Sequence, residues 1–221
     1  MPQKFDGDTY VAYCDLSGFK QMQDRDRKKA AQALEQLFQF TRKILDNRDR
    51  LLKTEVDAIG ISDCIISWAR DRKLDTLVSF LRQLHSQMIR KRYLLRTTIA
   101  YGDFWCHGSP GLSNLQVTCI AGKAYTSAYL ANVDFEPGMI VLLKTSRLPR
   151  PTGWRWHLTK RTGNCEYFWS ARQKRDIQRI EQERTKARNI KYRRLIEIYQ
   201  GRLQPARTTT KSPRSTRKGF F

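Results

Sequence analysis

The sequence contains no apolar run that approaches the ~20 residues needed for a membrane-spanning helix. Its first ten residues, MPQKFDGDTY, also lack the apolar segment of a secretory signal peptide. These two absences predict a cytoplasmic protein that has no membrane contact.

Cysteine pairs and histidine clusters are also missing. The five cysteines are scattered and form no Cys-x-x-Cys pair, and the three histidines share no ligand spacing. This pattern argues against a disulfide framework and against a zinc site, and it predicts reduced, buried thiols.

Acidic residues are scarce relative to basic ones. The chain has 42 Lys and Arg against 21 Asp and Glu, a net charge of +21, and residues 172–221 alone carry +12. Such a tail suits a polyanion (nucleic acid or anionic lipid) or simply keeps the protein soluble. A basic body would also favour a triphosphate substrate, and charge alone does not separate these interpretations.

The apolar residues that are present follow clear periods. At 221 residues and 40% apolar composition the chain can bury a core. Apolar runs bounded by turns predict strands and helical stripes predict helices, with Asp24 or Asp26 capping the first helix and a loop over 104–115. The predicted strands are 9–14, 51–61, 64–68, 94–101, 116–121, 139–143, 154–158 and 165–169, and the predicted helices are 27–47, 74–88 and 122–132.

This order predicts an α+β fold, a ferredoxin-like βαββαβ unit with extra closing strands. Its antiparallel sheet would carry helices on one face and leave the other face for a partner or ligand. Residues 1–170 would form this domain, 171–201 a basic helix, and 202–221 a disordered basic tail.

Two aspartates mark a candidate site. The apolar run Tyr10–Cys14 ends at Asp15, and a small turn follows before Phe19, whereas Asp63 occupies the tip of the next hairpin. A single Asp at a strand end is usually a turn or cap residue, but these two strands are neighbours in a split βαβ unit. The converging carboxylates therefore predict an Mg²⁺ or Mn²⁺ site completed by substrate phosphates. The turn can offer backbone N–H groups to those phosphates.

Five stretches resemble, in order, the motifs of the class III nucleotidyl cyclases: YVAYCDLSGF, AIGISDCIIS, LLRTTIAYGDFW, AGKAYTSAYLAN and LTKRTGNCEYFW. The resemblance covers about residues 8–170. It implies cyclisation of a nucleoside triphosphate with release of pyrophosphate, in a homodimer whose active sites lie at the interface.

The resemblance also implies roles for single residues. Two metal ions, Mg²⁺ or Mn²⁺, would be held by Asp15, Asp63 and the Leu16 carbonyl. Gly18 and Phe19 would cradle the triphosphate. Arg96 would face the nucleotide as a catalytic residue or support the fold, and Lys160 would contact the β/γ-phosphates unless it is only a solvated turn lysine.

The departures from the family pattern concern the base and the helix motif. Ile59 and Cys119 stand where adenylate cyclases carry the Lys and Asp that read adenine, and Thr126 and Leu130 replace the motif's Asn and Arg. An isoleucine side chain cannot donate to a purine edge, which argues against ordinary adenine recognition. Cys119 matches the guanylate cyclase pattern, but Ile59 does not.

Among the class III cyclases, the chain is most similar to the pyrimidine cyclases of bacterial Pycsar anti-phage defence. That resemblance implies cyclic UMP made from UTP, or cyclic CMP made from CTP, with UTP favoured, and a separate effector protein that responds to the product. Open alternatives are a purine cyclase, a nucleotide sensor without turnover, and an RNA-binding ferredoxin-like module. The sequence lacks the signature strand of RNA-recognition domains. Contact of the basic tail with nucleic acid is a further hypothesis.

Overall fold

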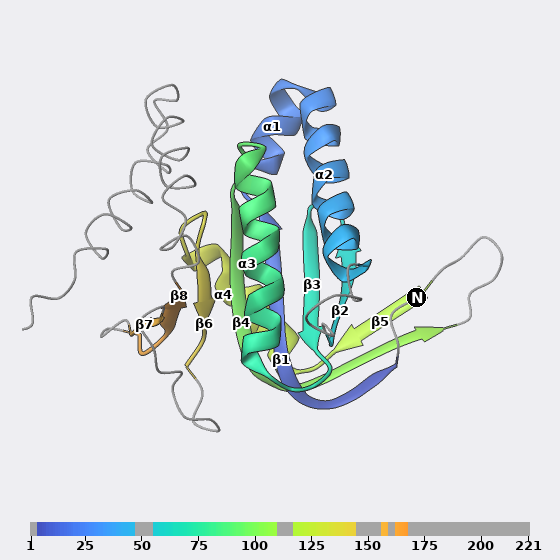
Figure 1. Cartoon of the computed structure of the whole chain (residues 1–221), viewed down its shortest axis with the longest axis vertical. Coiled ribbons are helices and arrows are strands. Elements are labelled where there is room, and N and C mark those ends of the chain that lie inside the picture. The colour runs from blue at the N-terminus through green and yellow to red at the C-terminus, as the bar shows by residue number, and fades with distance from the viewer. Residues whose placement is uncertain (1–3, 47–54, 110–116, 145–155, 159–161, 168–221) are drawn as a thin grey trace, which may run out of the picture.

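The computed structural model describes residues 4–46, 55–109, 117–144, 156–158 and 162–167 (Figure 1). Within these residues the chain alternates strands and helices as the periodicity predicted. The strands are β1 (Phe5–Leu16), β2 (Val56–Ile61), β3 (Cys64–Ala69), β4 (Leu95–Ser109), β5 (Val117–Ala121), β6 (Ile140–Leu142), β7 (Trp156–Leu158) and β8 (Cys165–Tyr167). The helices are α1 (Phe19–Arg25), α2 (Arg27–Asp46), α3 (Leu74–Arg90), α4 (Lys123–Ala131) and the 3-10 helix η1 (Asn132–Asp134).

All the described strands belong to one sheet in the order β2-β3-β1-β4-β6-β8-β7, with β5 paired to the far half of β4. The β2–β3 and β7–β8 hairpins are antiparallel, as predicted. β1 lies between β3 and β4 and is antiparallel to both. β6 runs parallel to β4, so the sheet is mixed and not purely antiparallel as expected.

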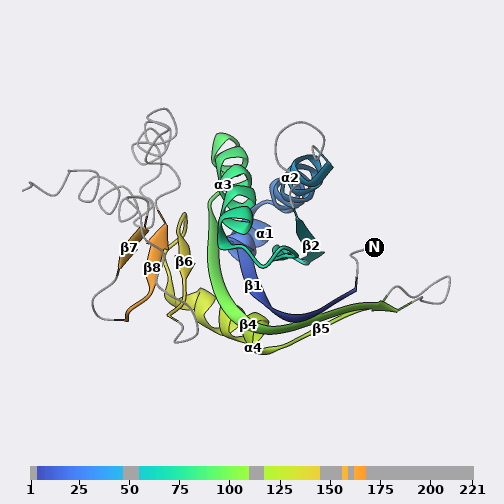
Figure 2. The same ribbon diagram turned by 60° about the horizontal axis from the view of Figure 1, so that its bottom comes forward.

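The two faces of the sheet are covered differently (Figure 2). The helices α2 and α3 pack on one face over the main core, which includes Leu37, Leu81 and Leu95. The other face carries a second apolar cluster around Trp68 and Phe104, against which α4 packs. The expectation of an open second face therefore needs correction, because α4 covers part of it.

Local contacts fix the position of α4. The N–H of Lys123 donates to Asp103 Oδ2 at 3.1 Å, which caps the helix with a residue of β4. Gly122 adopts a φ of 123°, and a Cβ atom there would lie 2.3 Å from the Asp103 carbonyl oxygen. Only a glycine permits this close approach of α4 to the sheet.

Three sequence predictions need adjustment. The segment expected to be a loop from 104 onward continues β4 as far as Ser109, where it pairs with β5. The short helix α1 was not predicted. Of the five thiols expected to be buried, Cys119 is exposed, because it lies on the outer side of β5.

Other predictions hold or lie outside the described residues. Asp26 caps α2, accepting a hydrogen bond from the Lys29 N–H at 3.0 Å. The expected basic helix (171–201) and tail (202–221) lie outside the described residues. In the part of the chain that the structure describes, no helix has the length and apolar character to cross a membrane.

Candidate functional site

Asp15 and Asp63 meet at one edge of the sheet, as the sequence predicted. Asp15 lies near the end of β1 and is paired in register with Cys64, the first residue of β3. Asp63 belongs to the two-residue turn between β2 and β3, which Ser62 closes with a left-handed φ of 54°. The Leu16 N–H donates to the Asp63 carbonyl at 3.0 Å, so the two segments are fixed to each other beside both carboxylates.

The Asp15 carboxylate is largely buried. Burial raises its pKa above the ordinary value, and the neighbouring charge of Asp63 raises it further, whereas the Arg96 guanidinium opposes the rise. A negative charge at this position is therefore stabilised only in part by the protein itself. A divalent cation with oxygen preference would supply the missing stabilisation.

The donors at this edge fit magnesium or manganese better than zinc. They are carboxylate and carbonyl oxygens, which Mg²⁺ and Mn²⁺ prefer, whereas zinc is usually held by nitrogen and sulfur ligands. Sites with few protein ligands are typical of Mg²⁺, which keeps its other positions for water and substrate phosphates.

The turn that follows Asp15 is tightly built. The Ser17 N–H donates to the Leu94 carbonyl at 2.9 Å, and Gly18 adopts a left-handed φ of 79° as the N-cap of α1. A Cβ atom on Gly18 would meet nothing within 4 Å, so space is open beside the first turn of the helix. The Ser17 hydroxyl is buried and finds no hydrogen-bond partner among the described residues. The Phe19 ring packs against the main core and anchors the helix.

Arg96 connects Asp15 to η1 on the face of the sheet that carries α4. It lies directly across from Asp15 in the β1–β4 register, and its Nη2 donates to Asp15 Oδ2 at 3.0 Å. Its Nε donates to Asn132 Oδ1 at 2.9 Å. In this geometry the guanidinium is held by a carboxylate and an amide.

Asn132 is a site residue that the sequence did not reveal. It is 2% exposed, and its Nδ2 lies 3.2 Å from each of three acceptors, the carbonyls of Tyr13 and Arg96 and the Thr98 hydroxyl. It therefore ties η1 to both β1 and β4. No local motif signals this function, since the partners come from strands far apart in the sequence.

An aromatic group flanks the aspartates on the α4 face. Tyr13 and Tyr129 meet edge to face at a ring distance of 5.2 Å, and Tyr125 stacks on Tyr129 at 6.1 Å. Burial is the main cause that raises the pKa of Tyr13, and the hydrogen bond from its hydroxyl to the Cys64 sulfur adds to it. The phenol therefore stays protonated and can donate to the Cys64 sulfur.

The other residues predicted for the site, Ile59, Cys119 and Lys160, are not all brought together by the fold. Ile59 is half-buried in β2 and packs against the second apolar cluster. Cys119 is exposed on β5, opposite His107, whereas its neighbour Ile120 points to the other side and joins the cluster that includes Ile59. Lys160 lies outside the described residues.

Two positions on α4, Thr126 and Leu130, stand where the family's helix motif has Asn and Arg. Thr126 donates its hydroxyl to the Gly122 carbonyl at 3.1 Å, and Leu130 is 64% exposed. Neither side chain approaches the aspartates of its own chain through a contact that the structure records.

The fold is that of nucleotide cyclase catalytic domains. The chain is similar to the guanylate cyclase domain of RhGC from Catenaria anguillulae, solved with GTP, at 16% identity and a TM-score of 0.51, covering 74% of this chain and 95% of that one. It is also similar to the adenylyl cyclase CyaB from P. aeruginosa at 16% identity and a TM-score of 0.51, covering 64% and 79%.

A bacterial light-regulated adenylyl cyclase gives a TM-score of 0.58 at 11% identity, covering 83% of this chain and 58% of that one. No protein-family model matches the sequence, and no curated protein is similar enough to match. At such identities the likeness concerns the fold.

Proposed function

We propose that the protein is a class III nucleotide cyclase, which converts a nucleoside triphosphate into a 3′,5′-cyclic nucleotide and pyrophosphate. The observation that carries this proposal is the meeting of Asp15 and Asp63 at one sheet edge, beside the turn into α1. The shared cyclase fold and the five ordered sequence motifs agree with it.

The oxygen donors of this site determine which metal ions it would bind. Asp15, Asp63 and the Leu16 carbonyl would hold two Mg²⁺ or Mn²⁺ ions together with the substrate phosphates. When bound, such ions lower the pKa of a hydroxyl and stabilise the charge of a leaving pyrophosphate. Arg96 keeps one oxygen of Asp15 oriented, so the other oxygen is presented in a fixed direction.

The chain's own groups position the triphosphate. The N–H groups of the Gly18–Phe19 turn border open space and would donate to phosphate oxygens. Lys160 would contact the β- and γ-phosphates from the closing hairpin. The ribose 3′-oxygen then forms a bond to the α-phosphorus while the bond from that phosphorus to the bridging oxygen breaks, pyrophosphate leaves, and the 3′-proton passes to solvent.

A homodimer would complete the site. Tyr129, Leu130 and Val133 are 48%, 64% and 71% exposed on α4 and η1, the face of the sheet opposite α2 and α3. Large apolar side chains grouped on one face are typical of a subunit contact. A second copy on this face would bring its α4 residues toward the aspartates, which agrees with the family's interfacial active sites.

For the base, we propose a pyrimidine, with UTP favoured over CTP. The apolar Ile59 and the exposed Cys119 provide no counterpart of the adenine-reading Lys and Asp, and the choice of a pyrimidine rests on the resemblance to the Pycsar cyclases. In that setting the cyclic nucleotide would act as a second messenger for a separate effector protein in anti-phage defence.

The test is to incubate purified protein with Mn²⁺ and ATP, GTP, CTP or UTP separately, and to identify products by mass. Cyclic UMP supports the cyclase and the preference for UTP, and cyclic CMP supports a pyrimidine cyclase that prefers CTP. A cyclic purine would retain the cyclase and overturn the interpretation of Ile59 and Cys119. Absence of any cyclic product would overturn the cyclase assignment.

A further inference from the structure

The charge of the described residues is strongly segregated. These residues carry 18 Lys and Arg and 16 Asp and Glu, so they are nearly balanced. Eight of the basic residues and only two of the acidic ones fall within residues 18–29 and 90–92, which leaves ten basic against fourteen acidic in the rest. We call this region the basic end. Its cations are Lys20, Arg25, Arg27, Lys28, Lys29, Arg90, Lys91 and Arg92, all exposed.

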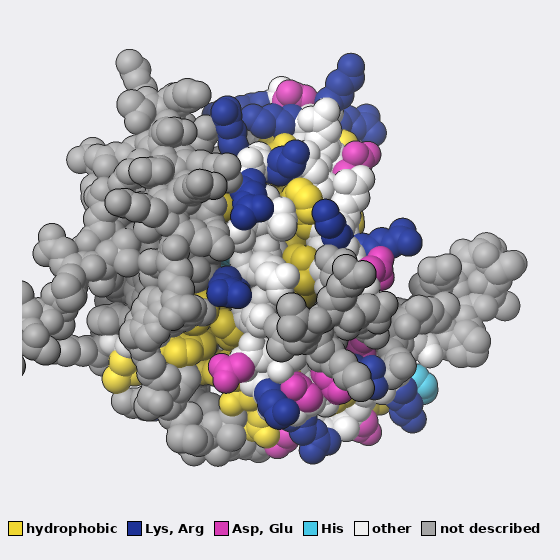
Figure 3. Space-filling model, in the orientation of Figure 1, with side chains coloured by type: hydrophobic (Ala, Val, Ile, Leu, Met, Phe, Trp, Pro, Cys, Tyr) yellow, Lys and Arg dark blue, Asp and Glu magenta, His cyan; other side chains and the backbone are white. Residues whose placement is uncertain are grey.

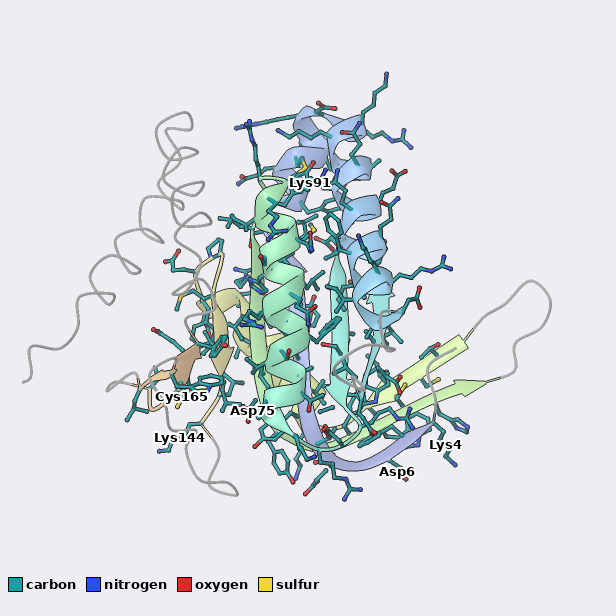
Figure 4. The ribbon with its side chains drawn as sticks, viewed as in Figure 1. Lys4, Asp6, Asp75, Lys91, Lys144 and Cys165 are labelled. Atoms are coloured by element: carbon teal, nitrogen blue, oxygen red, sulfur yellow. The ribbon has the colours of Figure 1, made fainter. Side chains whose placement is uncertain are left out.

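Three elements form the basic end. The helix α1, the beginning of α2 and the end of α3 come together there, and Lys91 lies beside α1 (Figure 4). The charge of Asp26, at the start of α2, acts on Tyr93 just after α3, which places these segments next to each other. Lys and Arg gather over this end of the surface, whereas Asp and Glu lie mainly toward the opposite end (Figure 3).

The surface chemistry narrows the kind of partner. The large apolar side chains exposed among the described residues are Phe38, Ile61, Tyr129, Leu130, Val133 and Leu158, and none lies in the basic end. A membrane-binding face usually adds apolar side chains that enter the lipid. Proteins that bind single strands usually stack bases on exposed aromatic rings. A basic surface without exposed apolar side chains or exposed aromatic rings is suited to the phosphate backbone of a double-stranded nucleic acid, because the bases of the duplex are already paired.

We propose that the basic end binds double-stranded nucleic acid through its phosphate backbone, independently of sequence. A single triphosphate bound near Gly18 would contact only the nearby part of this surface, whereas a duplex can contact the cations of all three elements. The proposal does not depend on cyclase activity, since it rests on charge and exposure alone.

The experiment measures binding of the full-length protein to fluorescent DNA and RNA duplexes of about 20 base pairs by anisotropy, over a range of salt concentrations. Two variants reverse charge on different elements of the basic end, Lys28→Glu/Lys29→Glu on α2 and Arg90→Glu/Lys91→Glu on α3. The matched control, Arg42→Glu/Lys43→Glu, changes the net charge equally in the last turns of α2, outside the basic end.

We expect both basic-end variants to bind duplex at least ~10-fold more weakly than the control, with the slope of log affinity against log salt reduced by about two. The basic tail is the same in every variant, so a difference in affinity between the basic-end variants and the control reports on the basic end. Thermal unfolding of each variant identifies any that has lost its fold.

Three results would overturn the proposal. One is wild-type protein that binds neither duplex. Another is an equal loss of affinity in the control and in the folded basic-end variants. The third is unchanged duplex binding together with lost binding to vesicles of phosphatidylserine and phosphatidylcholine, which would assign the surface to a membrane.

Discussion

Arg96 Nη2 donates to Asp15 Oδ2 at 3.0 Å across the β1–β4 ladder, and Asn132 Oδ1 accepts from the Nε of the same guanidinium at 2.9 Å. The side chain of one candidate metal ligand is therefore positioned from η1, through β4. Most of this arrangement is buried, so the interactions are stronger than at an exposed ion pair. The orientation of Asp15 therefore depends on Asn132, which does not contact the carboxylate itself.

Replacing Asn132 with Ala should destabilise the fold and the site together. The change removes the acceptor of the Arg96 Nε and the donor to the Tyr13 and Arg96 carbonyls and the Thr98 hydroxyl, which we expect to cost about 2 kcal/mol in the free energy of unfolding. Urea denaturation measures this loss. Thr126→Ala, on the exposed side of α4, should change stability by less than about 0.5 kcal/mol. Equal unfolding midpoints for Asn132→Ala and wild type would contradict the structural account.

The sheet edge around Asp15 shows how much the sequence could predict. Apolar runs identified β1 and β3 and a helical stripe identified α3, and the βαββαβ order then made β1 and β3 neighbours. Adjacent strands with known direction are enough to bring Asp15 and Asp63 together. The candidate metal site was thus predictable from strand order and two residue positions.

Two features, the second half of β4 and Asn132, were missed in the sequence because they depend on contacts between distant segments. The segment from Phe104 to Ser109 contains glycine and serine and was predicted as a loop, but its N–H and carbonyl groups pair with β5, which no local signal reveals. In the structure the segment alternates as a strand does, with Phe104 and Cys106 buried and His107 exposed. Asn132 was missed for a related reason, as its partners lie about 35 residues and more away along the chain.

His85 should make the fold less stable in acid. It is buried, its Nε2 lies 2.8 Å from the Thr97 hydroxyl, and burial lowers its pKa from 6.5 to about 3. The unfolded chain therefore takes up a proton below pH 6.5 that the folded chain takes up only near pH 3. The stability that comes from the neutral ring is complete above pH 6.5 and is lost as the pH falls toward 3.

The size of this loss can be measured directly. Between about pH 7 and about pH 5 the group should remove about 2 kcal/mol from the free energy of unfolding. His85→Gln keeps a polar side chain near Thr97 but does not titrate. Over the same pH range, its free energy of unfolding should therefore fall by about 2 kcal/mol less than that of the wild type. Parallel falls in urea midpoint for the two proteins would show that His85 does not titrate as described.

The exposed apolar residues of α4 should determine the oligomeric state. Leu130→Glu places a charge in the proposed subunit contact, so we expect a shift from dimer to monomer and a matching loss of cyclase activity. Sedimentation velocity measures the first and product formation the second. Leu158→Glu, a comparable change on β7, is the control and should leave the dimer intact. Identical sedimentation of Leu130→Glu and wild type would place the contact elsewhere.

The central claim is that Asp15 and Asp63 carry the chemistry, and one comparison tests it most directly. The rate of cyclic nucleotide formation with Mn²⁺ is measured for wild type, Asp15→Asn, Asp63→Asn and the exposed control Asp24→Asn. We predict that each site variant loses at least ~100-fold in rate while remaining folded, and that the control keeps wild-type activity. Turnover that survives in either folded site variant, or a wild-type protein that makes no cyclic product, would contradict the account.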